Sequence, residues 1–126
     1  MFDTLICEDN HAFRHSLRQL LVGHFPFMHI TEAADCKDAL RHALTQRYDL
    51  IFVDVRLPDG SGLELTRRIK AEFPDAVICV LTSYDMPEYR EAAMQCGASR
   101  FMVKGDVNDA EIIAVVKSLL VERRVQ

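Results

Sequence analysis

The chain has 126 residues, of which 49% are hydrophobic and 27% are charged, and these values fit one globular domain and exclude wholesale disorder. Its formal net charge is −4 without a dominant basic cluster, so we expect no direct binding of nucleic acid. Its apolar runs are far shorter than the roughly 20 residues that cross a bilayer, and its acidic start is unlike a signal peptide, so we expect a cytoplasmic protein without membrane contact.

Short apolar runs rich in β-branched residues are predicted as strands, and they recur five times along the chain. The predicted strands are Thr4–Cys7, Met28–Thr31, Leu50–Val53, Ala76–Leu81 and Arg100–Val103. These runs are almost wholly apolar instead of alternating with polar residues. The pattern therefore indicates a sheet that is covered on both faces.

A segment with helical spacing of apolar residues follows each predicted strand. The signals for helix starts and ends are Asp35 as an N-cap, Ser61 with Glu64 as a capping box, Pro87 in a first turn, Gly97 after a last turn, and Asn108 with Glu111. Five strand–helix units predict an α/β fold with right-handed crossovers. We expect a doubly wound (βα)5 three-layer sandwich, flavodoxin-like, with a parallel sheet in the order 2-1-3-4-5.

Polar side chains follow four of the five predicted strands. Glu8 and Asp9 follow the first strand, Asp54 the third, Thr82 the fourth and Lys104 the fifth. All of them lie at carboxyl ends, where open α/β sheets bind ligands, and neighbouring strands are roughly 4.8 Å apart. Lys104, two strands away from Asp54, is expected to close about 10 Å with its flexible side chain.

Three carboxylates gathered in this way repel one another unless a cation or protons offset their charge. Hard oxygen donors suit Mg²⁺, and a carboxylate can also act as the nucleophile that accepts a phosphoryl group. The hydroxyl of Thr82 and the ammonium of Lys104 both suit phosphate oxygens. Together these residues predict a site for phosphoryl transfer.

The chain resembles a bacterial response-regulator receiver domain from Thr4 to about Leu120. The likeness lies in the acidic pair Glu8–Asp9, in Asp54 within DLIFVDVRLPDGSG, in Thr82 within VLTS and in Lys104 within FMVKG. It implies that Asp54 is the phosphoacceptor and that the metal, Mg²⁺ or Mn²⁺, is held by Asp9, Glu8, Asp54 and the backbone carbonyl of Arg56. It also implies that Thr82 and Lys104 hold the phosphoryl oxygens and that Phe101 is an aromatic switch.

The same resemblance implies a donor and an output. The donor would be a sensor histidine kinase or a phosphotransfer protein, and the domain would assist its own phosphorylation and dephosphorylation without being an enzyme for another substrate. Residues 1–126 would form a single receiver domain without an output domain. Phosphorylation would change the surface of the fourth helix, fifth strand and fifth helix, and we expect it to favour a homodimer through Met86–Cys96, Arg100–Val103 and the last helix.

Two positions depart from the common pattern of this family. Gly105 follows the lysine where many receivers have a cis-proline, and receivers joined to LuxR-type helix-turn-helix domains often lack that proline. Gly60 stands where the family often has Met or Leu. The first departure indicates the LuxR-type subgroup, and the second is a common variation.

Three other functions remain alternatives at this point. An Asp-nucleophile phosphatase of the haloacid-dehalogenase type needs an acid two residues after its nucleophile, and Arg56 stands there instead. A flavodoxin-like FMN binder needs a phosphate-binding loop of N–H donors after the first strand, where Glu8 and Asp9 would repel phosphate. A phosphorylation-independent interaction module of the same fold is the third alternative.

Overall fold

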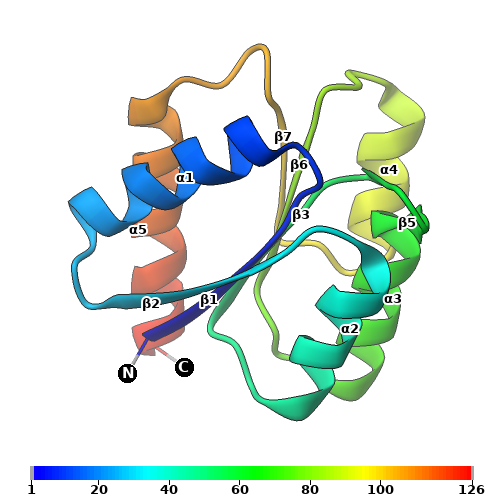
Figure 1. Cartoon of the computed structure of the whole chain (residues 1–126), viewed down its shortest axis with the longest axis horizontal. Coiled ribbons are helices and arrows are strands. Elements are labelled where there is room, and N and C mark those ends of the chain that lie inside the picture. The colour runs from blue at the N-terminus through cyan, green and yellow to red at the C-terminus, as the bar shows by residue number, and fades with distance from the viewer. Residues whose placement is uncertain (1, 126) are drawn as a thin grey trace.

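The computed structural model describes residues 2–125, with side chains as far as Val121. The elements in chain order are β1 (Phe2–Cys7), α1 (His11–His24), β2 (Met28–Ala33), α2 (Cys36–Thr45), β3 (Leu50–Val53), β4 (Arg56–Leu57), β5 (Gly60–Ser61), α3 (Gly62–Glu72), β6 (Ile78–Thr82), α4 (Pro87–Gln95), β7 (Arg100–Val103) and α5 (Asp109–Val125). Helices α1 and α5 lie on one side of the sheet, and α2, α3 and α4 lie on the other (Figure 1). The three-layer prediction is confirmed.

The main sheet has five parallel strands in the order β2-β1-β3-β6-β7. This order is the predicted 2-1-3-4-5, because β6 and β7 are the fourth and fifth strands of that sheet along the chain. Cys7 pairs with Val53, Val53 with Val80, and Thr82 with Val103. The carboxyl ends of β1, β3, β6 and β7 therefore meet at one edge of the sheet.

Alternate residues of each strand enter two separate cores. Leu5, Ile51 and Val80 face the core under α2, α3 and α4, whereas Ile6 and Phe52 face the core under α1 and α5. All five side chains are at most 2% exposed. The nearly uniform apolar strands are explained by this double coverage, since each face of the sheet needs its own apolar set.

Most of the predicted helix ends are confirmed, and one is wrong in part. Asp35 caps α2, Pro87 occupies the start of α4, and Gly97 has φ of 100° after α4. Ser61 does cap α3, but its side chain accepts from the backbone N–H of Leu63, and Glu64 pairs with Arg67. The expected capping box is therefore absent, because the Glu64 carboxylate finds a cationic partner one turn along the helix.

The strand boundaries differ from the prediction by two residues or fewer. β1 begins at Phe2 because that residue pairs with Met28, and β6 extends to Thr82 because that residue pairs with Val103. The short antiparallel pair β4–β5 was not predicted, and it begins two residues after Asp54. A Cβ atom added at Gly62 would lie 1.8 Å from the Asp54 carbonyl oxygen, so this glycine lets α3 start against the end of β3.

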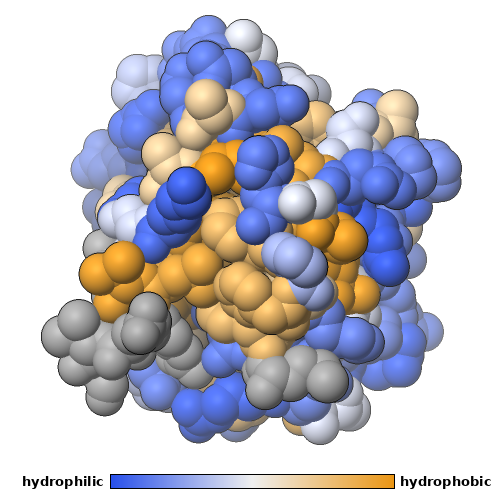
Figure 2. All heavy atoms as spheres, turned by 90° about the vertical axis from the view of Figure 1, so that its left-hand side faces the viewer, coloured by the Kyte–Doolittle hydropathy of each residue, from blue (hydrophilic) through white to orange (hydrophobic). Residues whose placement is uncertain are grey.

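The face formed by α1, α5 and the edge strand β2 carries apolar surface bordered by hydrophilic residues (Figure 2). Phe27 precedes β2 and is 56% exposed, and its ring meets the rings of Phe2 and Phe25 edge-on. None of the helices in the described part of the chain is long and apolar enough to span a bilayer.

Candidate functional site

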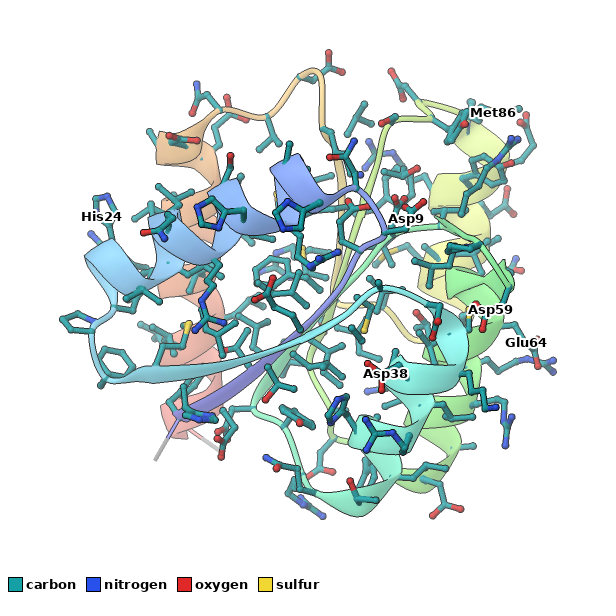
Figure 3. All side chains as sticks on the ribbon, in the orientation of Figure 1. Asp9, His24, Asp38, Asp59, Glu64 and Met86 are labelled. Atoms are coloured by element: carbon teal, nitrogen blue, oxygen red, sulfur yellow. The ribbon has the colours of Figure 1, made fainter. Side chains whose placement is uncertain are left out.

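The first acidic residues of the site are placed by the end of β1 and the start of α1. Glu8 is 2% exposed, and its backbone N–H donates to the Ala33 carbonyl of β2 at 2.9 Å. Asp9 is exposed and lies at the carboxyl edge of the sheet, where β1 leads into α1 (Figure 3). Asn10 caps α1 by accepting from the Phe13 N–H, and its own N–H donates to Glu8 Oε2 at 3.1 Å. A helix cap thus fixes the acidic pair beside the sheet.

Asp54 joins this pair from the neighbouring strand. It follows β3, is 8% exposed, and its N–H donates to the Cys7 carbonyl at 3.0 Å. One carboxylate oxygen from each of Glu8, Asp9 and Asp54 lies within 4.8 Å of the other two. Among the described side chains, the buried Asp54 Oδ1 has no hydrogen-bond partner. A buried oxygen of this kind is costly unless a cation or donor binds it.

The side chain of Lys104 extends from the end of β7 to the acids, as predicted. Its Nζ lies 3.1 Å from Asp54 Oδ2 and also forms an ion pair with Glu8 Oε1. Its backbone N–H donates to the Thr82 carbonyl, which ties the end of β7 to the end of β6. Gly105 follows it through a trans peptide bond. The ammonium therefore offsets part of the negative charge that the acids concentrate here.

Burial and neighbouring charges shift the pKa values of Glu8 and Lys104. Burial raises the pKa of Glu8 to about 7, although hydrogen bonds from Lys104 and from the N–H of Asn10 lower it. Burial alone would lower the pKa of Lys104, but its hydrogen bonds to Glu8 and Asp54 outweigh burial and raise the pKa. The ammonium form of Lys104 is therefore favoured by the acids around it.

Thr82 and Phe101 lie on adjacent strands next to the acids. Thr82 is fully buried, and its Oγ1 accepts from the Tyr84 N–H at 3.2 Å. Phe101 is 7% exposed, and the Arg90 guanidinium of α4 lies 4.8 Å from the centroid of its ring. The ring of Phe101 thus lies inward in this structure, in which Thr82 Oγ1 accepts from the Tyr84 N–H.

Arg56 begins the small β4–β5 sheet, two residues after Asp54, and its side chain points to an aromatic pair. Its guanidinium lies 4.1 Å from the centroid of the Tyr84 ring and donates to the Tyr89 hydroxyl at 3.0 Å. Any role of Arg56 toward a metal therefore belongs to its backbone carbonyl. The side chain instead links the segment after β3 to the segment after β6 and to α4.

Three residues of the site were not identified from the sequence. Arg14 donates to the Glu8 carbonyl, the ring of Phe13 lies 4.5 Å from Lys104 Nζ, and Gly62 packs on the Asp54 carbonyl. In the sequence, Phe13 belongs to the apolar residues with helical spacing that follow the first predicted strand. The contacts of Arg14 and Phe13 depend on where α1 docks, and the sequence carries no local signal for that docking.

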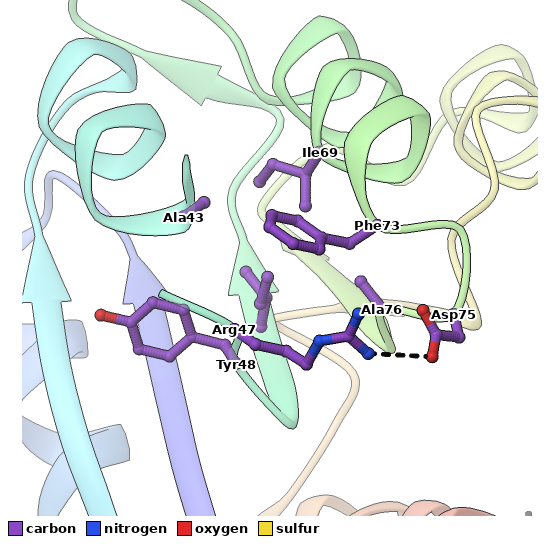
Figure 4. Close-up of a pocket in the computed structure, with 8 residues that line it drawn as sticks. Ala43, Arg47, Tyr48, Ile69, Phe73, Asp75 and Ala76 are labelled. Atoms are coloured by element: carbon purple, nitrogen blue, oxygen red, sulfur yellow. Dashed lines mark hydrogen bonds and ion pairs between the residues drawn. The ribbon is translucent and has the colours of Figure 1, made fainter. Parts of the chain in front are cut away.

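A small cavity at the opposite edge of the sheet is not part of this site (Figure 4). It lies where loops enter β3 and β6, and an ion pair of 3.1 Å between Arg47 and Asp75 borders it. Its volume of about 10 Å³ has room for little more than one water molecule. We therefore place the functional site at the carboxyl edge, where the acids gather.

The donor set at the carboxyl edge fits a hard divalent cation. Three carboxylates, one of them with an unpartnered buried oxygen, are ligands that Mg²⁺ accepts together with water. A hydroxyl and an ammonium stand beside them on the next two strands, and both suit the oxygens of a phosphoryl group. The arrangement can thus hold a metal, an anion and a nucleophilic carboxylate at one point.

Comparison with known proteins agrees with this chemistry. Residues 4–117 match the family model described as the response regulator receiver domain. The chain is 33% identical over 119 residues to the DNA-binding transcriptional activator DevR/DosR of Mycobacterium tuberculosis, a match that covers 94% of this chain and 54% of that protein. The chain spans about half the length of the curated relatives that it matches.

Solved structures of response regulators are also similar to this chain. The response regulator TrrA from Thermotoga maritima, in complex with Mg²⁺ and beryllofluoride, matches with a TM-score of 0.84 and 30% identity over 94% of this chain and 99% of that one. A LuxR-family two-component response regulator from Aurantimonas matches with a TM-score of 0.85 and 26% identity, over 96% and 86% of the two chains. The match to a LuxR-family regulator agrees with the LuxR-type subgroup that Gly105 indicated.

Proposed function

This chain belongs to the response regulator receiver domain family, and on that premise we propose that it accepts a phosphoryl group on Asp54 in a Mg²⁺-dependent reaction. The observation that carries the proposal is the position of Asp54, whose Oδ2 contacts Lys104 while its Oδ1 has no partner among the described residues. Receiver domains act as signalling modules, so the phosphorylated protein itself would carry the signal.

In the transfer, a carboxylate oxygen of Asp54 forms a bond to phosphorus. The bond between phosphorus and the donor's imidazole nitrogen breaks, and the imidazole leaves with the electron pair and takes up a proton. A phosphohistidine of a sensor kinase or phosphotransfer protein is the donor of this class. Because the transferred group carries spread negative charge, cationic and hydrogen-bonding groups around it supply most of the stabilisation.

The metal would be held by Asp9, Asp54, the carbonyl of Arg56 and, through water, Glu8. Bound Mg²⁺ or Mn²⁺ supplies positive charge that offsets both the carboxylates and the incoming phosphoryl oxygens. The close approach of one oxygen from each of the three acids supports this assignment. Among the side-chain ligands proposed, Asp9 is the exposed one, which suits a ligand that exchanges with solvent.

Lys104 and Thr82 would hold the phosphoryl oxygens. Lys104 is bonded to both Glu8 and Asp54, so its Nζ already lies beside the atom that would be modified. Thr82 Oγ1 accepts from the N–H of Tyr84, and its hydroxyl hydrogen would donate to a phosphoryl oxygen. We expect this new bond to pull the segment after β6 toward Asp54.

The output surface would be α4, β7 and α5. Since the ring of Phe101 already lies inward beneath Arg90, phosphorylation would stabilise this orientation and would not need to create it. The change is then a shift of population, limited by the preference of the phosphoryl group for one state. Met94 of α4 is 50% exposed and lines an open, shallow pocket, and Met86, just before α4, is 41% exposed. We propose that this surface binds a second copy of the chain after phosphorylation.

Intact-mass measurement after incubation with acetyl phosphate and Mg²⁺ tests the phosphoacceptor assignment. We expect the mass of one phosphoryl group to be added, no addition in the presence of a chelator, and no addition for Asp54→Asn. Unchanged labelling of Asp54→Asn would place the acceptor elsewhere. No labelling of the natural sequence by acetyl phosphate or a phosphohistidine donor would favour the phosphorylation-independent module. Steady release of phosphate from unrelated phosphomonoesters would favour the phosphatase.

Sedimentation with and without beryllofluoride, a phosphoryl mimic, tests the dimer separately. We expect dimers with the mimic and monomers without it, and Met94→Lys should prevent the dimer while leaving phosphorylation intact. A monomer under both conditions at high protein concentration would contradict the dimer but not the phosphoacceptor.

A further inference from the structure

A single arginine connects the acidic loop, residues 8–10 between β1 and α1, to the edge of the sheet. Arg14 lies near the start of α1, and its side chain is only 15% exposed. Its Nη1 donates to the carbonyl oxygen of Glu8 at 2.7 Å, and its Nε pairs with Glu32 Oε1 of β2 at 2.9 Å. A second arginine, Arg18, holds the other oxygen of Glu32 at 3.0 Å. The guanidinium of Arg14 is therefore supported on one side and bonded to the acidic loop on the other.

The carbonyl that Arg14 binds has a special position in the chain. It belongs to the planar peptide unit that joins Glu8 to Asp9, so its direction also fixes where the Asp9 backbone begins. The N–H of Glu8 is already fixed by the Ala33 carbonyl. With Arg14 on the carbonyl, both sides of Glu8 are held by β2, directly through Ala33 and indirectly through Glu32. The side chain of Asp9 is exposed and is not held in the core, so its direction depends on this peptide.

The chemistry of the contact requires an arginine. Nε and Nη1 are rigidly placed in one plane and serve two acceptors at once, whereas a lysine offers a point charge on a flexible stem. The positive charge also lies next to a loop that brings three carboxylates together, where it reduces their mutual repulsion.

We infer that Arg14 is a positioning residue that orients the Glu8–Asp9 peptide and thereby sets Asp9 for metal binding. The metal part of this inference rests on the proposed function. Groups that orient metal ligands from outside the ligand set change metal affinity about 10- to 100-fold when they are removed. Arg14 acts on the ligand through a backbone carbonyl, so we expect an effect near the lower limit.

The test compares Arg14→Ala with Arg18→Ala, which removes one bond to Glu32 but leaves the bond to the Glu8 carbonyl. Mg²⁺ affinity is measured by calorimetric titration, and we expect about tenfold weaker binding for Arg14→Ala and less than about twofold for Arg18→Ala. Arg14→Lys should resemble Arg14→Ala. Amide hydrogen exchange without metal is the second measurement, and we expect faster exchange in the Arg14 variants only at Glu8 and Asn10, whose N–H groups are hydrogen-bonded.

The outcomes separate this inference from the proposed function. Failure of the natural sequence to bind Mg²⁺ would overturn the metal-dependent function. Unchanged exchange at Glu8 and Asn10 would overturn the positioning role with or without metal. Equal loss of Mg²⁺ affinity in Arg14→Ala and Arg18→Ala would also overturn it, because the effect would then come from Glu32. If Arg14→Ala does not fold, Arg14→Lys provides the same comparison with the charge retained.

Discussion

The Lys104 ammonium lies 3.1 Å from Asp54 Oδ2, although the two residues are 50 positions apart in the chain and stand on strands that do not pair. The same ammonium contacts Glu8, which is more deeply buried than Asp54. One cation thus serves two buried carboxylates. This relationship makes Lys104 a stabilising residue of the metal-free fold as well as the proposed ligand of the phosphoryl group.

Replacing Lys104 by Met should destabilise the metal-free protein at neutral pH by about 3 kcal/mol, because two buried carboxylates lose their cation. Urea denaturation in the presence of a chelator measures this effect. The control is Lys117→Met on the exposed face of α5, which removes the same charge from the surface. Adding Glu8→Gln to Lys104→Met should recover part of the loss. Equal stability of the two single variants would contradict the buried role of Lys104.

Replacing Asp9 by Asn should raise the melting temperature without metal, because it relieves repulsion among three carboxylates within 4.8 Å. With Mg²⁺ the natural sequence should have the higher melting temperature, since a ligand at 100 times its Kd stabilises the protein that binds it by about 2.7 kcal/mol. Thermal unfolding with chelator and with excess Mg²⁺ measures both effects. Glu72→Gln, an exposed acid on α3, is the matched control and should respond to Mg²⁺ like the natural sequence. If Mg²⁺ raises the melting temperature of Asp9→Asn as much as that of the natural sequence, Asp9 is not a metal ligand.

Two glycine substitutions should have opposite effects. Gly62→Ala should destabilise the fold by about 3 kcal/mol or more, because the added Cβ would overlap the Asp54 carbonyl, which is backbone and cannot swing away. Gly23→Ala in α1 should stabilise it by about 0.5 kcal/mol, since nothing lies within 4 Å and alanine favours helix. Urea denaturation of both variants measures the contrast. Equal effects would mean that α3 does not start against β3 in this way.

The acid dependence of stability should include a contribution from Asp59. Hydrogen bonds from the N–H groups of Cys36 and then Lys37 lower the pKa of this carboxyl below its ordinary 3.8. A lowered pKa in the folded state gives stability that is complete above the unfolded pKa and is lost as pH falls through the folded pKa. The advantage of the natural sequence over Asp59→Asn should therefore be larger at pH 6 than at pH 3, as measured by urea denaturation. Asp85→Asn, an exposed acid before α4, is the control. A difference that does not change with pH would contradict the hydrogen bonds of the Asp59 carboxylate to the start of α2.

Local patterns in the sequence were sufficient for the layout of the molecule. Apolar runs and caps act over a few neighbouring residues, so the five main strands could be placed within two residues. Their uniform apolarity predicted a sheet covered on both faces, and the strand–helix alternation predicted its order. The acids at Glu8, Asp9 and Asp54 could be brought together for the same reason, because parallel strands end at a common edge.

The choice of partners among these side chains was decided only by the tertiary structure. Glu64 had two possible partners nearby, the N-terminal N–H groups of its own helix and Arg67, and the sequence does not rank them. Arg14 meets the Glu8 carbonyl only because α1 docks beside β2, and Asp59 accepts from the N–H of Cys36, which begins a helix 23 residues earlier. The inward position of Phe101 depends likewise on the space under α4. Such contacts depend on distances across packed elements, and those distances exist only once the two cores have formed.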